Sequence, residues 1–160
     1  MDRDLYGLSE RCGHWLLARR WTLATAESCT GGWVAKALTD VPGSSSWFER
    51  GFVTYTNRAK QELLGVRPAT LERWGAVSEQ TVREMVAGAL HHSPATAALA
   101  VSGIAGPTGG TPDKPVGLVW FAWGRRDGAL YTAQEHFTGD REAVRRQSVL
   151  TALEGVMRLD

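Results

Sequence analysis

The chain has 160 residues, of which 43% are apolar and 22% charged, as in an ordinary globular domain. Its net charge of +1 argues against nucleic acid or an acidic membrane as a partner. No apolar run approaches the roughly 20 residues of a membrane helix, and the acidic start Met1-Asp2-Arg3-Asp4 lacks a secretory signal, so we expect a cytoplasmic protein.

Predicted helices and strands alternate over the first two thirds of the chain. Apolar residues at helical spacing mark the helices, whereas β-branched, aromatic or unbroken apolar runs mark the strands. In chain order these elements are a helix over 5–20, a strand over 21–26, a helix over 33–38, a strand over 52–56, a helix over 57–64 capped by Asn57, a helix over 79–91 capped by Ser78, and a strand over 97–102. The stretch with Gly65, Pro68 and Gly75 is expected to be a loop.

The last third begins with a long loop rich in glycine and proline, over 103–117. Strands over 118–123 and 130–137 then resemble a hairpin that turns at Arg126-Asp127-Gly128, and Asp140 is placed to cap a final helix. Because strands and helices interleave, we predict one α/β domain spanning residues 1–160, with three α/β/α layers. The hairpin requires a mixed rather than an all-parallel sheet.

The turn over 27–32 is the first candidate site. It joins a strand directly to a helix, and Ser28, Thr30, Gly31 and Gly32 would expose backbone N–H groups at the positive helix end. Such groups suit a phosphate or a developing oxyanion. Alternatively, Ser28 or Thr30 merely caps the helix. No Walker-type lysine follows the glycines.

A second candidate combines Ser45, Tyr55 and Lys60 without a suitably placed histidine, which suggests a serine–lysine amidase site. The lysine would have to be neutral to accept a proton. Lowering its pKa from ~10.4 towards ~7 requires roughly 4–5 kcal/mol of selective disfavour for the charged form. The alternative is a solvated surface lysine and a tyrosine in the core.

Two further segments could bind a ligand. Gly103 and Gly106 lie in the loop after a buried strand, a common ligand-binding position in α/β sheets, although no helix follows as in a dinucleotide fingerprint. Arg141 and Arg145 are four residues apart on a helix and either clamp a phosphate or are simply solvated. The cysteines and histidines have no metal-ligand spacing, so we expect no metal and no cofactor.

Together these segments resemble the CinA C-terminal domain family, the nicotinamide mononucleotide deamidases. The resemblance extends from about Leu8 to Leu153. The motifs that carry it are Thr25-Ala26-Glu27-Ser28-Cys29-Thr30-Gly31-Gly32, Pro42-Gly43-Ser44-Ser45, Gly51-Phe52-Val53-Thr54-Tyr55-Thr56-Asn57 with Lys60, Gly75-Ala76-Val77-Ser78, Ser102-Gly103-Ile104-Ala105-Gly106-Pro107 with Lys114-Pro115-Val116-Gly117, and Gly139-Asp140-Arg141.

The resemblance implies a three-layer homodimer, in the stand-alone form of the domain, that hydrolyses nicotinamide mononucleotide to nicotinic acid mononucleotide and ammonia. It also implies a Ser–Lys mechanism without a metal, with Ser28, Ser45, Tyr55 and Lys60 at the active-site positions. We favour Ser45 over Ser28 as the nucleophile and expect Tyr55 to hydrogen-bond Lys60 or the leaving ammonia. Two other functions stay open: a non-catalytic nucleotide-binding module, and an amidase for another small amide such as nicotinamide.

Overall fold

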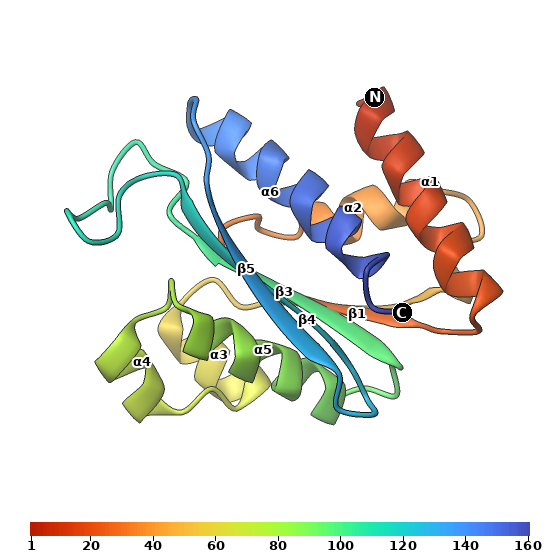
Figure 1. Ribbon diagram of the computed structural model, residues 1–160, viewed down its shortest axis with the longest axis horizontal. Helices are drawn as coiled ribbons and strands as arrows, with labels where there is room; N and C mark the ends of the chain where they lie inside the picture. The colour runs from red at the N-terminus through yellow and green to blue at the C-terminus, as the bar shows by residue number, and fades with distance from the viewer.

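A five-stranded sheet lies between two layers of helices in the computed structural model, which describes residues 1–160 (Figure 1). The strands are β1 (Leu23–Glu27), β2 (Phe48–Val53), β3 (Ala97–Gly103), β4 (Leu118–Arg125) and β5 (Leu130–His136). Their order is β2-β1-β3-β4-β5; the first three are parallel, and β4 and β5 are antiparallel to their neighbours. The predicted mixed α/β sheet is therefore confirmed.

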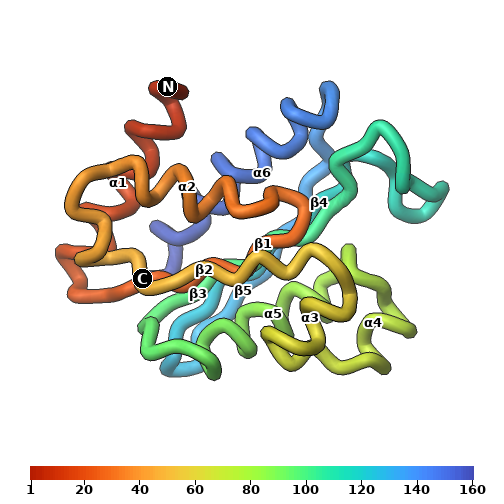
Figure 2. Tube along the Cα trace, turned by 180° about the vertical axis from the view of Figure 1, so that it is seen from behind, coloured from red at the N-terminus to blue at the C-terminus, as the bar shows by residue number.

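Helices cover both faces of the sheet (Figures 1 and 2). One layer contains α1 (Arg3–Ala18), α2 (Trp33–Thr39) and α6 (Arg141–Val156); the other contains α3 (Asn57–Leu64), α4 (Pro68–Trp74) and α5 (Glu79–His91). None of these helices is long and apolar enough to span a bilayer.

Side chains of the buried strand β3 point alternately into the two apolar cores, one on each face of the sheet. Leu99 and Val101 join the apolar cluster under α1, α2 and α6, whereas Ala98 and Ala100 join the cluster under α3, α4 and α5. Successive side chains of a strand point to opposite faces, so an unbroken apolar run fits a strand covered on both sides. By the same alternation, the next residue, Ser102, belongs to the face that α3 and α5 cover.

Three local predictions need correction. Strand β2 begins at Phe48 and ends at Val53, so residues 54–56 form a connection rather than the end of a strand. Thr56, not Asn57, caps α3, because its extended backbone lets its hydroxyl accept from the N–H of Ala59 at 3.0 Å. The expected loop after Gly65 contains α4, which starts with a proline at its first position, where the missing N–H costs nothing.

The carboxyl ends of the three parallel strands meet at one edge of the sheet. Glu27, the last residue of β1, pairs in register with Val53 of β2 and Val101 of β3. The residues that follow these three, Ser28, Thr54 and Ser102, are therefore lateral neighbours, although the sequence separates them by up to 74 positions.

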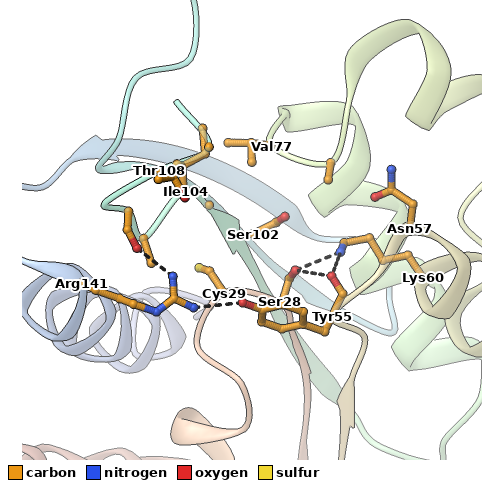
Figure 3. Close-up of a pocket in the computed structure, with 15 residues that line it drawn as sticks. Ser28, Cys29, Tyr55, Asn57, Lys60, Val77, Ser102, Ile104, Thr108 and Arg141 are labelled. Carbon is orange, nitrogen blue, oxygen red and sulfur yellow. Dashed lines mark hydrogen bonds between the residues drawn. The ribbon is translucent and has the colours of Figure 1, made fainter. Parts of the chain in front are cut away.

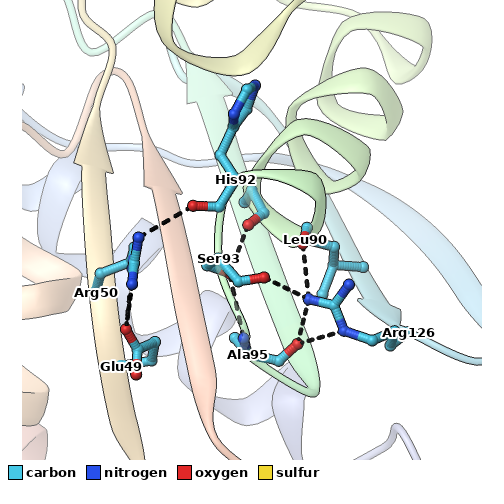
Figure 4. A network of polar contacts seen from close by, with 8 residues as sticks. Glu49, Arg50, Leu90, His92, Ser93, Ala95 and Arg126 are labelled. Carbon is cyan, nitrogen blue, oxygen red and sulfur yellow. Dashed lines mark hydrogen bonds and ion pairs between the residues drawn. The ribbon is translucent and has the colours of Figure 1, made fainter.

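At the opposite edge of the sheet, two arginine side chains bind backbone carbonyl groups (Figure 4). Arg126, in the predicted hairpin turn, donates to the carbonyls of Leu90, Ser93 and Ala95 at 2.7 Å each. Arg50 donates to the His92 carbonyl at 3.1 Å. These contacts satisfy carbonyl groups at the end of α5 and just after it, so the two arginines have a structural role at this edge.

Candidate active site

A cleft of about 260 Å³ opens at the carboxyl ends of β1, β2 and β3 (Figure 3). Ligands of open α/β sheets bind at this edge. Its lining combines small loop residues with a few polar side chains, which are Ser28, Tyr55, Asn57, Lys60, Ser102, Thr108 and Arg141.

Lys60 lies beside Ser28 at the floor of this cleft (Figure 3). Its Nζ is 2.9 Å from Ser28 Oγ, and it donates to the carbonyls of Thr54 at 2.9 Å and Tyr55 at 3.2 Å. Lys60 is in the first turn of α3, so its side chain reaches back beneath the connection from β2. It is only 1% exposed, which is rare for a lysine.

Burial lowers the pKa of Lys60 from 10.5 to about 8. No carboxylate forms an ion pair with it, so desolvation outweighs the contacts that favour the charged amine. A neutral amine has two N–H donors and one lone pair. The two carbonyls can take both donors, which leaves the lone pair for the hydroxyl proton of Ser28. The geometry therefore suits Lys60 as a base and Ser28 as a nucleophile.

Glu27 fixes the turn that carries Ser28. Its fully buried carboxylate accepts from the Thr30 hydroxyl at 2.6 Å and from the first N–H groups of α2, at Val34 (2.8 Å) and Ala35 (3.0 Å). Burial raises the pKa of this carboxyl, while these hydrogen bonds oppose the increase. Glu27 thus caps α2 and holds the preceding turn.

The turn glycines lie just before α2, as the sequence predicts, but they do not line the cleft that contains Ser28 and Lys60. Because Glu27 occupies the N-terminus of α2, that helix end is closed to a phosphate. Thr30 is buried and bonded to Glu27, and Gly31 and Gly32 line a separate depression together with Thr30 and Arg145. Their predicted role in binding substrate stays a prediction.

Ser45 is remote from Lys60, contrary to our preference for it as the nucleophile. It is exposed in a short 3-10 helix, Ser44–Ser46, just before the amino end of β2. Thr54, whose carbonyl binds Lys60, follows the carboxyl end of the same strand, and six residues of strand span roughly 17 Å. Nearness in sequence misled the prediction because the strand carries the chain across the sheet.

Tyr55 meets Lys60 through its backbone, not through its phenol as predicted. Its hydroxyl instead accepts from Arg141 Nη2 at 3.0 Å, and Arg141 Nη1 donates to the Gly106 carbonyl at 2.8 Å. Arg141 therefore stands at the rim of the cleft with its guanidinium held in place. Gly103 and Gly106 also line the cleft.

The two arginines of α6 do not form one clamp. Arg145 turns away and donates to the carbonyls of Cys29 at 3.1 Å and Thr30 at 3.2 Å, so it braces the turn from outside. Only Arg141 lines the cleft with Ser28 and Lys60.

The sequence analysis missed Ser102 and Asn57 as site residues. Both lie within the motifs of the family resemblance, but no spacing rule distinguishes them from neighbouring polar residues. Their place in the cleft follows from strand register for Ser102 and from the start of α3 for Asn57. No group of three His, Cys, Asp or Glu residues is placed to hold a metal ion.

Comparison with known proteins gives matches over almost the whole chain. The CinA C-terminal domain family matches residues 5–159. The chain is 55% identical to a nicotinamide-nucleotide amidohydrolase PncC of Enterobacter agglomerans, over 98% of this chain and 96% of that protein. It is 57% identical to the protein of that name from Escherichia coli K12, over 96% and 93%.

Solved structures agree with these sequence matches. A competence/damage inducible protein CihA from Agrobacterium tumefaciens superposes with a TM-score of 0.97 at 45% identity, covering 99% of this chain and 97% of that one. A CinA superfamily protein from Klebsiella pneumoniae gives a TM-score of 0.93 at 44% identity, covering 96% of each chain.

Proposed function

We propose that the chain, which belongs to the CinA C-terminal domain family, is an amidohydrolase that converts nicotinamide mononucleotide to nicotinic acid mononucleotide and ammonia. The observation that carries this proposal is the buried Ser28–Lys60 pair, which has the geometry of a nucleophile and its base. Sequence identity of 55% and 57% to two nicotinamide-nucleotide amidohydrolases, over nearly the full length of the chain, supports the choice of substrate.

Acylation begins when neutral Lys60 takes the proton of the Ser28 hydroxyl. The serine oxygen bonds to the carboxamide carbon, and the carbonyl electron pair moves to its oxygen to give a tetrahedral intermediate. This intermediate collapses as the carbon–nitrogen bond breaks. Lys60 returns its proton to the departing nitrogen, which leaves as ammonia.

Deacylation repeats these proton transfers with water as the nucleophile. Lys60, neutral again, takes a proton from the water, whose oxygen bonds to the acyl carbon of the ester on Ser28. The ester bond then breaks, Ser28 regains its proton from Lys60, and the carboxylic acid product ionises. The same lysine serves both half-reactions, and the scheme uses neither a metal nor a cofactor.

Arg141 is our candidate for binding the substrate phosphate. It provides the cleft with a positive charge, and its contacts to Tyr55 and Gly106 leave its planar donor groups oriented at the rim. Val77 and Ile104 contribute apolar side chains to the lining of the cleft, against which we place the pyridine ring (Figure 3). The nucleotide would then extend from the Ser28–Lys60 pair towards Arg141.

The proposal includes a homodimer in the cytoplasm, as the family resemblance implies, with the nucleotide as its small-molecule partner. Size-exclusion chromatography with light scattering tests the dimer. Incubation of the purified protein with nicotinamide mononucleotide, followed by measurement of ammonia and of the acid product, tests the activity. Binding without ammonia release would favour a nucleotide-binding module, and turnover of nicotinamide alone would favour a different amidase.

A further inference from the structure

Ser102 is a buried polar residue of the cleft that the mechanism above leaves unused. It is 1% exposed and lines the cleft, yet its hydroxyl makes no hydrogen bond within the chain (Figure 3). The neighbouring buried polar side chains are all engaged: Thr30 bonds to Glu27, and Ser28 and Lys60 bond to each other. Unlike the sealed hydroxyl of Ser9, the unpaired Ser102 hydroxyl opens to the cleft, so its natural partner is a ligand bound there.

Strand register places Ser102 directly beside Ser28. Glu27 and Val101 are paired residues of β1 and β3, and the Ser28 N–H donates to the Val101 carbonyl at 3.0 Å. The next residue on each strand, Ser28 and Ser102, therefore points to the same face of the sheet. This is the face covered by α3, from which Lys60 reaches the site.

The order of the strands puts Lys60 and Ser102 on opposite sides of Ser28. Strand β1 lies between β2 and β3, so the Thr54 carbonyl that anchors Lys60 is on one side, and Ser102 is on the other. An amide carbon bonded to Ser28 Oγ must direct its nitrogen towards Lys60, which protonates it. The carbonyl oxygen then turns away from Lys60, towards β3.

We propose that Ser102 is a catalytic residue whose hydroxyl donates a hydrogen bond to the carboxamide oxygen of the substrate and to the oxyanion that it becomes. The inference rests on the proposed function and extends it to a residue with no assigned role. The Ser102 proton stays on its oxygen throughout, so the hydroxyl stabilises charge without transferring a proton. The N–H of Cys29, a residue that also lines the cleft, makes no backbone hydrogen bond and is our candidate for a second donor.

Ser102→Ala tests this role, with Ser9→Ala as the matched control. Ser9 is also fully buried with an unpaired hydroxyl, but it lies on α1, away from the cleft. We expect Ser102→Ala to lower kcat about 10²-fold, the usual loss for one oxyanion donor, with KM nearly unchanged. The midpoint of the pH profile, set by Lys60, should not move. Ser9→Ala should retain wild-type kinetics.

A thioamide analogue of nicotinamide mononucleotide identifies the atom that Ser102 contacts. Sulfur accepts hydrogen bonds weakly, so the ratio of wild-type to Ser102→Ala rates should fall from about 10² to a few-fold with this analogue. An equal ratio for amide and thioamide, or a shifted pH midpoint, would overturn the proposed contact. Ser102→Cys, which keeps the side-chain shape, replaces the alanine variant if that variant fails to fold, and the same losses are expected.

Wild-type turnover distinguishes failure of this inference from failure of the proposed function. If the wild-type protein releases no ammonia from nicotinamide mononucleotide, the proposed function itself is wrong. If the wild-type protein is active and Ser102→Ala matches it, only the role of Ser102 is wrong.

Discussion

Lys60 Nζ lies 2.9 Å from Ser28 Oγ with no carboxylate paired to it. A buried lysine with a carboxylate partner would stay charged and could not accept a proton at neutral pH. Here the only other partners are two backbone carbonyls, so desolvation sets its protonation and lowers its pKa to about 8.

The rate should rise with pH through the pKa of Lys60. The free enzyme needs the neutral amine, so kcat/KM should increase about tenfold per pH unit below pH 8 and level off above it. Initial rates of ammonia release between pH 6 and 9.5 in buffers of constant ionic strength measure this. A profile that is flat or falling over that range would contradict a lysine base.

Stability should depend on pH through the same residue. The unfolded chain holds the Lys60 proton up to about pH 10.5, whereas the folded chain releases it near pH 8, so the unfolded state binds more protons between these values. The free energy of unfolding therefore rises with pH across this window. Compared with Lys60→Met, the wild-type protein should gain about 2.5 kcal/mol between pH 7 and pH 10.

Urea denaturation at both pH values, applied to both proteins, measures this gain. The comparison cancels the titration of groups that the two proteins share. A difference in stability that stays constant with pH would mean that Lys60 is not desolvated. Lys60→Met should also lose nearly all activity.

Removing Ser28 should abolish the acyl-enzyme, whereas removing Ser45 should not. Ser28 is beside the base, and Ser45 is exposed at the far end of β2. Mass spectrometry of the intact protein after rapid quenching with nicotinamide mononucleotide should detect an adduct in the wild type and in Ser45→Ala. An adduct that persists in Ser28→Ala and disappears in Ser45→Ala would restore Ser45 as the nucleophile.

Arg141→Gln should weaken binding of the phosphate with little effect on kcat. Loss of charged hydrogen bonds worth roughly 1.5–3 kcal/mol raises KM about 10- to 150-fold. KM for the riboside without the phosphate should change little, because that substrate lacks the group that Arg141 binds. Arg83→Gln is the matched control, since Arg83 pairs with Glu79 on the exposed side of α5. Equal losses for nucleotide and riboside would exclude Arg141 as the phosphate ligand.

Exhaustive dialysis against EDTA should leave activity intact, because side chains carry every step of the proposed mechanism. Ammonia release measured before dialysis, after dialysis and after zinc is added back checks this expectation. Loss of activity that zinc restores would replace the Ser–Lys mechanism with a metal-dependent one.

The sequence by itself predicted most helices and strands, because the residue patterns that specify them are local. Periodicity marked the helix Glu79–His91 with its Ser78 cap, the apolar run marked β3, and Asp140 marked the start of α6. It also pointed to Ser28 and Lys60 as candidates, through residue types and the family motifs. The start of β2 and the helix after Gly65 were missed because local patterns there compete with tertiary packing.

Only the tertiary structure decided which candidates work together. Whether Ser28 or Ser45 meets Lys60 depends on which end of a strand each occupies, and a strand moves the chain by roughly 3.3 Å per residue across the sheet. The pairing of Glu27 with Val101 brings Ser28 to Ser102 across 74 positions of sequence. Burial, which lowers the pKa of Lys60, depends equally on packing, because no single segment of the chain can exclude water from a lysine by itself.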